Sequence, residues 1–133
     1  MIAVDTSVLI AILMAEIEKD DFIRFIVGHQ PAHLSAVSLL EAGMIMRSRR
    51  GRDGVADLQD LIAALHVRVA PFDEVQSRIA IEAFERYGKG MGTSAKLNMG
   101  NCATYSLAKS LNVPLLFKGD DFSATDITVA LTL

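Results

Sequence analysis

Five short apolar segments, each suited to a buried strand, are separated along this chain by stretches with helical periodicity. They cover residues 1–4, 32–35, 67–70, 114–117 and 127–130. Strands that alternate with helices pair in parallel through right-handed crossovers, and helices then cover both faces of the sheet. The pattern predicts an α/β fold with a mainly parallel sheet of about five short strands flanked by helices.

The helical stretches are bounded by residues that favour helix ends. Helices are expected over residues 8–14, 17–27, 37–50, 55–66, 74–87 and 102–111. Thr6 or Ser7 is expected to cap the first helix, Asp73 the fifth and Asn101 the last, since short polar side chains accept hydrogen bonds from free amides at helix starts. The glycine-rich segment 89–100 is expected to be a loop.

The composition is that of one compact domain. The chain has 133 residues, of which 51% are hydrophobic and 22% are charged, so residues 1–133 are expected to fold around a single core. The longest apolar run, residues 8–15, is too short to span a bilayer. The lone Cys102 forms no intrachain disulfide and is compatible with a reducing compartment. We expect a soluble, cytoplasmic protein that does not associate with membranes.

Positive charge is concentrated in one place. The net charge of −3 argues against a wholesale electrostatic attraction to nucleic acid. Four arginines nevertheless fall within residues 47–52, near the expected end of a helix: Arg47, Arg49, Arg50 and Arg52. Binding of phosphate groups accounts for this cluster, and so does the general preference of cations for a helix C-terminus.

Acidic side chains follow two of the expected strands. Asp5 comes directly after residues 1–4, and Asp120 and Asp121 come just past residues 114–117. Ligands of parallel α/β sheets bind at the carboxyl ends of the strands, so both positions lie where a site is expected. A helix cap at Asp5 and a turn at the Asp pair also account for each position taken alone.

Glu41 is a more informative acid. Its neighbours one helical turn away are mostly apolar: Val37, Ser38, Met44 and Ile45. A charge on such a face must be paired, protonated or bound to a metal, because burial of an isolated ion is costly. If Asp5, Glu41 and Asp120 converge after strands of one sheet, their repulsion requires a cation. Ligand sets made only of oxygen suit Mg²⁺, and Mn²⁺ can substitute. A salt bridge from Glu41 to an arginine is the alternative.

Four segments, taken together, resemble VapC-type toxins of the PIN-domain ribonuclease family. They are MIAVDTSVLI at 1–10, SLLE at 38–41, LNMGNCATYSLAK at 97–109 and PLLFKGDDF at 114–122. The resemblance implies a PIN-domain three-layer sandwich and a Mg²⁺-dependent endoribonuclease, the toxin of a type II toxin–antitoxin pair. It also implies a homodimer, an RNA substrate and a VapB-like antitoxin encoded alongside.

The family's acids carry over to this chain with one loss. Its first and second acids correspond to Asp5 and Glu41, and its third falls on Asn101, where the family has Gly-Asp-Cys. The fourth often lies three residues before the Phe, where this chain has Gly119, so Asp120 or Asp121 takes the role, and Asp120 is favoured. A second departure is Phe117, where many relatives carry a small hydroxyl residue.

The resemblance also implies roles for the neighbouring residues. The acids would hold one or two metal ions that lower the pKa of a bound water for attack on the phosphodiester. Thr6 or Ser7 would orient a ligand or this water. The candidates for contact with the RNA backbone are basic residues, and they indicate no preference for a particular RNA sequence. They are Arg47, Arg49, Arg50, Lys89, Lys96 and Lys118.

Asn101 separates this chain from the family's activity. It keeps a carbonyl oxygen but lacks the negative charge on which metal affinity depends, so weak metal binding and much reduced cleavage are expected. A natural variation and an inactivating Asp→Asn change made for production of a toxic protein both account for it. The rival interpretation is a catalytically silent PIN-like module that binds RNA or a protein.

Two apolar segments are candidates for contact with a partner. The helix around Met44–Met46 and the apolar face of residues 17–27 suit an antitoxin helix or a dimer, and ordinary core packing accounts for them equally.

Overall fold

The computed structural model describes all residues, 1–133. Its elements follow one another in the order β1 (Ile2–Val4), α1 (Thr6–Leu13), α2 (Lys19–Gly28), β2 (Ala32–Ser35), α3 (Ala36–Ala64), β3 (Val67–Ala70), α4 (Glu74–Tyr87), α5 (Met99–Leu111) and β4 (Leu115–Leu116). None of these helices combines the length and apolar character that a membrane span needs.

The strands form one parallel sheet in the order β3-β2-β1-β4. Ile2 lies opposite Ala32, and Ala3 lies opposite Leu115, so β1 occupies the interior of the sheet. The expected last strand at residues 127–130 is reduced to an isolated bridge between Leu115 and Val129. The predicted α/β fold with a parallel sheet is confirmed, with four strands in place of about five.

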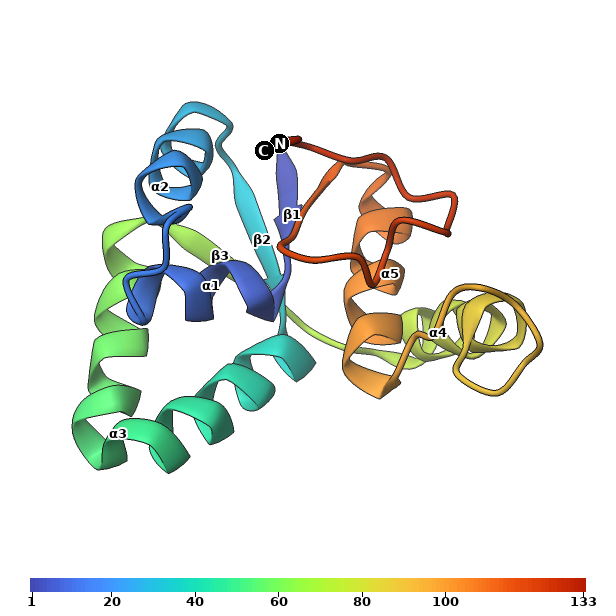
Figure 1. Ribbon diagram of the computed structural model, residues 1–133, viewed down its shortest axis with the longest axis horizontal. Coiled ribbons are helices and arrows are strands. Elements are labelled where there is room, and N and C mark those ends of the chain that lie inside the picture. Colours follow the sequence, from blue (N-terminus) through green and yellow to red (C-terminus); the bar gives the residue numbers. More distant parts are fainter.

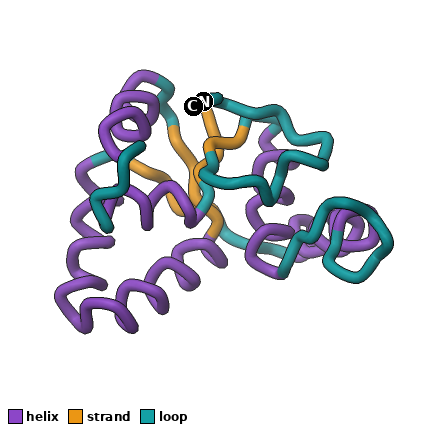
Figure 2. Tube along the Cα trace, in the orientation of Figure 1, coloured by secondary structure: helices purple, strands orange, loops and turns teal.

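Side chains of β1 alternate between two hydrophobic clusters, one on each face of the sheet. Ile2 and Val4 are buried with residues of α1, α2 and α3, whereas Ala3 is buried with residues of α4 and α5. Figure 1 shows α1, α2 and α3 on one side of the strands and α4 and α5 on the other. The molecule is therefore the three-layer sandwich that the resemblance implied, with its strands in the middle (Figure 2).

Two helices begin earlier than the sequence predicted. The first starts at Thr6 rather than at residue 8, because the Asp5 side chain accepts the amide of Ser7 and is itself the cap. The last starts at Met99, and its cap is Asn98 rather than Asn101. Asn98 and Asn101 are equally good capping residues by type, so the local sequence does not distinguish them.

The two helices predicted over residues 37–50 and 55–66 are two arms of α3 joined at a sharp bend (Figure 1). Gly51 lies at the bend with φ 66° and ψ −151°, a backbone conformation that glycine adopts without strain. The second arm ends at Ala64, and His66 beyond it has a φ of 53°. Gly51, which lies between the two predicted helices, thus changes the direction of the helix rather than ending it.

Candidate active site

Asp5 lies at the carboxyl end of β1, where the first acid of the site was expected. Its side chain is buried, with 6% of the residue exposed. Oδ1 accepts a hydrogen bond of 2.8 Å from Thr104 Oγ1, and Oδ2 accepts the Ser7 amide at 3.1 Å. Hydrogen bonds to both oxygens fix the direction of the carboxylate.

A short chain of hydroxyl groups supports Asp5 from behind. Because the Thr104 hydroxyl donates its only hydrogen to Asp5, the Ser38 hydroxyl must donate to Thr104 Oγ1, 3.1 Å away. Thr6 in turn donates to the Ser38 carbonyl at 3.3 Å. The sequence alone indicates no role for Ser38 or Thr104, although each lies three residues from a candidate site residue, on the same helix face.

Glu41 lies in the first arm of α3 against the start of α5. A Cβ atom added to Gly100 would lie 2.7 Å from Glu41 Oε2, so the carboxylate packs directly on the α5 backbone. The cavity beside it has mostly apolar walls, which include Val37, Met44 and Met99. Glu41 forms no ion pair, so the structure does not contain the alternative salt bridge to an arginine.

Asn101 is the third residue of α5, and its side-chain amide is held from two sides. Its Oδ1 accepts the Asn98 amide at 3.1 Å, while its own backbone amide donates to Asn98 Oδ1 at 2.9 Å. This reciprocal capping box satisfies two of the free amides at the helix start. Its Nδ2 donates to Asp121 Oδ2 at 3.3 Å.

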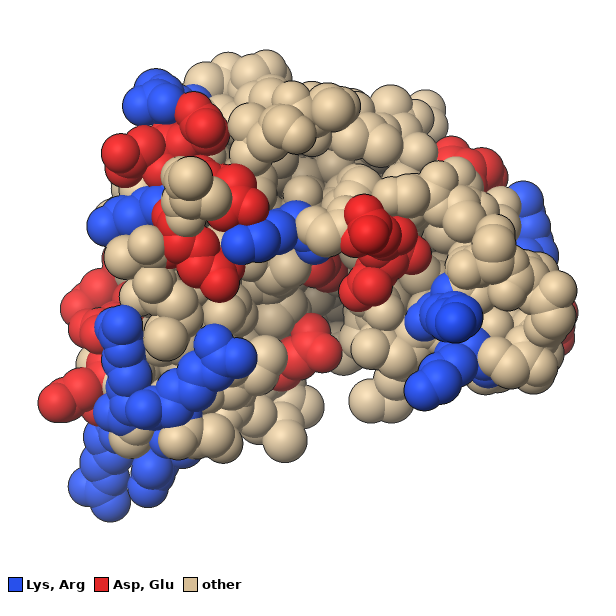
Figure 3. Space-filling model, in the orientation of Figure 1, with Lys and Arg blue, Asp and Glu red and all other residues tan.

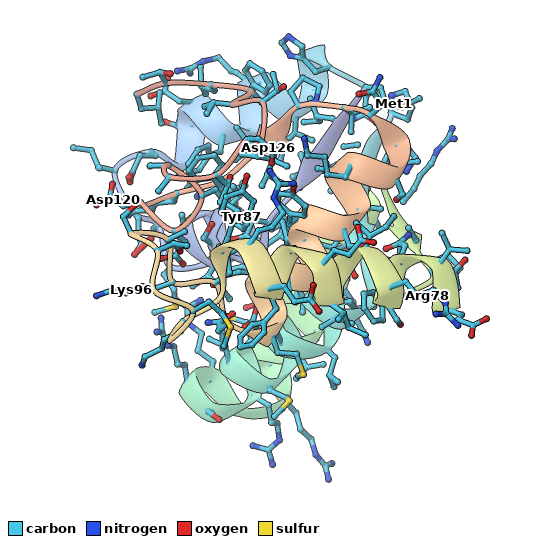
Figure 4. The ribbon with its side chains drawn as sticks, turned by 90° about the vertical axis from the view of Figure 1, so that its right-hand side faces the viewer. Met1, Arg78, Tyr87, Lys96, Asp120 and Asp126 are labelled. Atoms are coloured by element: carbon cyan, nitrogen blue, oxygen red, sulfur yellow. The ribbon has the colours of Figure 1, made fainter.

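The two adjacent aspartates occupy different surroundings. Asp121 contacts Asn101 and thus the start of α5, whereas Asp120 lines a separate cavity of about 390 Å³ with Glu18 and Lys118. Figure 4 shows Asp120 on the same side of the molecule as Lys96. The sequence favours Asp120 as the fourth acid, but the aspartate that the structure brings to Asn101 is Asp121.

Three carboxylates from three separate elements thus contact the first two turns of α5. Asp5 bonds Thr104, Glu41 packs on Gly100 and Asp121 bonds Asn101. The N-terminus of a helix carries partial positive charge, which favours acids placed around it. This arrangement is the candidate active site.

The residues present do not supply a complete set of metal ligands. No three His, Cys, Asp or Glu side chains lie close enough together to hold an ion. Asn101, at the position of the missing acid, turns an N–H group rather than an oxygen toward Asp121. An amide N–H cannot coordinate Mg²⁺, which takes oxygen ligands. The chain in this form does not fit a tightly held divalent cation.

Side chains of Ser7 and Lys118, two further predicted site residues, are occupied by contacts within the protein. Ser7 Oγ accepts the Lys118 backbone amide at 3.0 Å. Lys118 Nζ bonds Glu16 and Glu18 at 3.0 and 3.1 Å. These hydrogen bonds raise the pKa of Lys118, and the bond from Lys118 lowers the pKa of Glu18. Lys118 therefore joins the end of β4 to the α1–α2 connection, and its charge is more than balanced by two acids.

The arginine cluster lies at the bend of α3. Figure 3 shows Lys and Arg side chains gathered over the corner that this helix forms, away from the central acids. The four arginines are exposed, and Arg50 alone has a partner, Asp57, at 4.0 Å. Arg47, Arg49 and Arg52 are thus free to contact an anionic ligand.

Comparison with known proteins identifies the family. The sequence model of the PIN domain matches residues 2–127. The chain belongs to the PIN-domain family. Among its relatives is ribonuclease VapC28 of Mycobacterium tuberculosis, which is 38% identical over 128 residues, 96% of each chain. Ribonuclease VapC42 of the same species is 37% identical over 130 residues, 97% of this chain and 98% of that one.

Solved structures of other proteins share the fold. VapC20 of M. tuberculosis, described as a toxin that cleaves the sarcin–ricin loop, superimposes with a TM-score of 0.78 at 17% identity. The alignment covers 96% of this chain and 97% of VapC20. FitAcB of Neisseria gonorrhoeae gives a TM-score of 0.71 at 20% identity, over 97% and 96% of the two chains. At such identities the likeness establishes the fold alone.

Proposed function

We propose that the protein is the toxin of a VapBC-type toxin–antitoxin pair, with a Mg²⁺-dependent endoribonuclease site that Asn101 leaves weakened or inactive. The observation that carries this proposal is the convergence of Asp5, Glu41 and Asp121 on the first two turns of α5. Full-length similarity to VapC ribonucleases supports the same activity.

With an acid at position 101, the residues that would hold Mg²⁺ in this proposal are that acid together with Asp5, Glu41 and Asp121. Such a metal supplies Lewis-acid polarisation of a phosphate and a water of lowered pKa. The protein's own part is to fix the Asp5 carboxylate through Thr104 and the Ser7 amide. Thr6 and Ser7 act in this proposal by positioning Ser38 and Lys118.

RNA is proposed to approach across the face that carries the acids and the bend of α3 (Figure 3). Arg47, Arg49 and Arg50 would hold its phosphates, because exposed cations on the same face as the acids offset the repulsion between RNA and carboxylates. Lys118 is a weaker candidate for such a contact than the sequence suggested, since its ammonium group already pairs with Glu16 and Glu18.

The test is an RNA-cleavage assay in Mg²⁺ with the chain as it stands and with Asn101→Asp. The substitution is expected to raise the cleavage rate by at least about 100-fold, because loss of a charged metal ligand costs that order of activity. A second variant, Asn101→Asp combined with Asp5→Asn, is expected to return to the background rate. Unchanged inactivity of the folded Asn101→Asp protein would overturn the proposal.

The second candidate function is a silent PIN module that binds RNA or a protein without cutting. The hydrogen bond from Asn101 to Asp121 favours this silent module, since the bond gives the Asp121 carboxylate a partner without a metal. Calorimetric titration with Mn²⁺ separates the two functions. A silent module shows no specific Mn²⁺ site even after Asn101→Asp, whereas the ribonuclease gains one.

An antitoxin is the proposed protein partner. Structures similar in fold include a toxin–antitoxin complex from Klebsiella pneumoniae. Two adjoining cavities of the present chain share Val37 and Met99, and their walls are largely apolar. Exposed apolar surface of this kind marks protein contact sites. Met99, which is 81% exposed, is the residue whose change to Glu should abolish co-purification with an antitoxin.

The proposed homodimer has its own test. Light scattering in solution should give twice the chain mass of 14.4 kDa if two copies associate. Each of the two segments considered for partner contact, residues 17–27 and the helix around Met44–Met46, contains both buried and exposed apolar residues. Met46, Phe22 and Ile26 are buried, while Met44 and Val27 are exposed.

A further inference from the structure

We infer that the Asn101 side chain takes the place of a divalent cation, so that the acid site of this chain is stable with no metal bound. This inference rests on the proposed function, in which the same site would otherwise hold Mg²⁺. It concerns the stability of the metal-free protein rather than its ability to cleave RNA.

The orientation of the Asn101 amide is fixed by its two neighbours. The Asn98 amide is a donor and needs an oxygen opposite it, and the Asp121 carboxylate is an acceptor and needs an N–H group. In the observed orientation both contacts are hydrogen bonds. With the amide turned over, two donors would face each other at Asn98 and two oxygens at Asp121, so both contacts would be repulsive.

An aspartate at this position would meet a different situation on its second side. One carboxylate oxygen could still accept the Asn98 amide, so the helix cap would survive. The other oxygen would lie about where Nδ2 now is, 3.3 Å from Asp121 Oδ2. Two carboxylates at that separation repel each other, and a cation between or beside them would offset the repulsion.

Burial on one side limits how far solvent can relieve this conflict. Asn101 is 8% exposed, whereas Asp121 lies at an exposed position. Water therefore reaches an acid at position 101 less well than it reaches Asp121, and a metal ion beside the two carboxylates would offset their repulsion more fully. The neutral amide removes the conflict by donating a hydrogen bond where a carboxylate would be repelled.

The experiment measures thermal unfolding of the full chain in a chelator and in Mn²⁺, for the chain as it stands and for Asn101→Asp. The Tm of the unsubstituted chain is expected to be the same in both conditions. The Tm of Asn101→Asp is expected to fall by roughly 5 °C in the chelator and to rise by at least as much in saturating Mn²⁺. Equal Tm values of the two proteins in the chelator, or a Mn²⁺-dependent rise in the unsubstituted chain, would overturn the inference.

A second variant separates charge repulsion from general damage. Asn101→Asp combined with Asp121→Asn exchanges the amide and the carboxylate, so one hydrogen bond between the two positions is retained. Its Tm in the chelator should lie within about 2 °C of the unsubstituted chain and should not respond to Mn²⁺. If Asn101→Asp does not fold without metal, recovery by Mn²⁺ or by the second substitution supports the inference, and recovery by neither overturns it.

The outcomes distinguish this inference from the proposed ribonuclease function. A Mn²⁺-stabilised Asn101→Asp protein that leaves RNA intact overturns the ribonuclease proposal alone. An Asn101→Asp protein that cleaves RNA but whose Tm changes neither in the chelator nor in Mn²⁺ overturns the cation-replacement inference alone.

Discussion

Thr104 Oγ1 donates a 2.8 Å hydrogen bond to Asp5 Oδ1, although the two residues lie 99 positions apart in the sequence. The bond joins α5 to the end of β1 and gives the buried carboxylate one of its two donors. It also brings the Ser38 hydroxyl into the same network. The direction of the Asp5 carboxylate thus depends on α3 and α5 as well as on its own strand.

Thr104→Val tests this network. It leaves Asp5 Oδ1 and the Ser38 hydroxyl without their partner in a buried place, so the free energy of unfolding should fall by about 1–3 kcal/mol. Unfolding in urea, with an unchanged m-value, measures this loss of free energy. The conservative Thr104→Ser should recover most of it. The control Ser110→Ala, on the outer surface of α5, should stay within about 0.5 kcal/mol; an equal loss there would mean that the buried network is not the cause.

Gly100→Ala tests the packing of Glu41 on α5. The new methyl group would meet Glu41 Oε2 at 2.7 Å, so the carboxylate must move away from the site. In the Asn101→Asp background, RNA cleavage should fall by roughly 10–100-fold, as expected when a catalytic group is misplaced.

The matched control is Gly43→Ala in α3, where an added Cβ meets nothing within 4 Å. This change should leave cleavage intact and raise the free energy of unfolding by about 0.5–1 kcal/mol, because alanine favours a helix interior over glycine. Equal cleavage by the Gly100→Ala and Gly43→Ala proteins would show that Glu41 does not act where the structure places it.

The arginines at the bend of α3 should contribute to RNA affinity rather than stability. Arg47→Ala with Arg49→Ala should weaken binding of single-stranded RNA and reduce the slope of log affinity against log salt by about 0.7 for each phosphate that the protein no longer neutralises. Fluorescence anisotropy over a series of NaCl concentrations measures both quantities. Arg78→Ala is the control, since Figure 4 shows Arg78 on the side of the molecule opposite Asp120. An unchanged slope in the double variant would exclude phosphate binding by this cluster.

Lys118→Met should lower stability through Glu16 and Glu18. The two acids would be left close together with no cation between them, so the Tm should fall, and by more in low salt than in high salt. Lys118 titrates above its ordinary pKa and Glu18 below its own, so the contribution of the pair is lost at the acidic and the alkaline extremes. Lys19→Met, which removes an unpaired lysine from α2, should change the Tm little in either salt condition.

His33 predicts a loss of stability in mild acid. Burial, followed by the charge of Arg68, lowers the pKa of His33 in the folded protein, and its Nε2 has no hydrogen-bond partner. The unfolded chain therefore binds a proton more readily, and stability falls as the pH drops below about 6.5 toward the folded pKa. His33→Gln should flatten the Tm profile between pH 7.5 and 5.5 by roughly 2–4 °C, whereas His66→Asn, at an exposed position, should leave the profile as it is.

Most of the fold could be predicted from local patterns. Residues 32–35 and 67–70 are strands as expected, and Asp73 caps α4 as expected. The start of α5 could not be predicted, because both Asn98 and Asn101 suit a cap and the residue types do not distinguish them. The last predicted strand, residues 127–130, forms only a single bridge, because its pairing depends on how the polar turn before it directs the chain.

Asp5 lies at the carboxyl end of β1, where its position in the sequence suggested. Glu41 lies within α3, and its packing on Gly100 at the start of α5 is a contact between distant parts of the chain. Asp121 rather than Asp120 contacts Asn101, and the turn before both aspartates contains Gly119 with a φ of 97°. Two adjacent residues of the same type cannot be told apart by a local pattern.

The reciprocal cap between Asn98 and Asn101 has an evolutionary consequence. An aspartate can accept the Asn98 amide as well as an asparagine does, so exchange of the two residues leaves the helix start in place. Asparagine and aspartate codons differ by one base. The chain therefore lies a single nucleotide from an acid at this position, and a lineage that carries it can lose and regain that charge without rebuilding the fold around it.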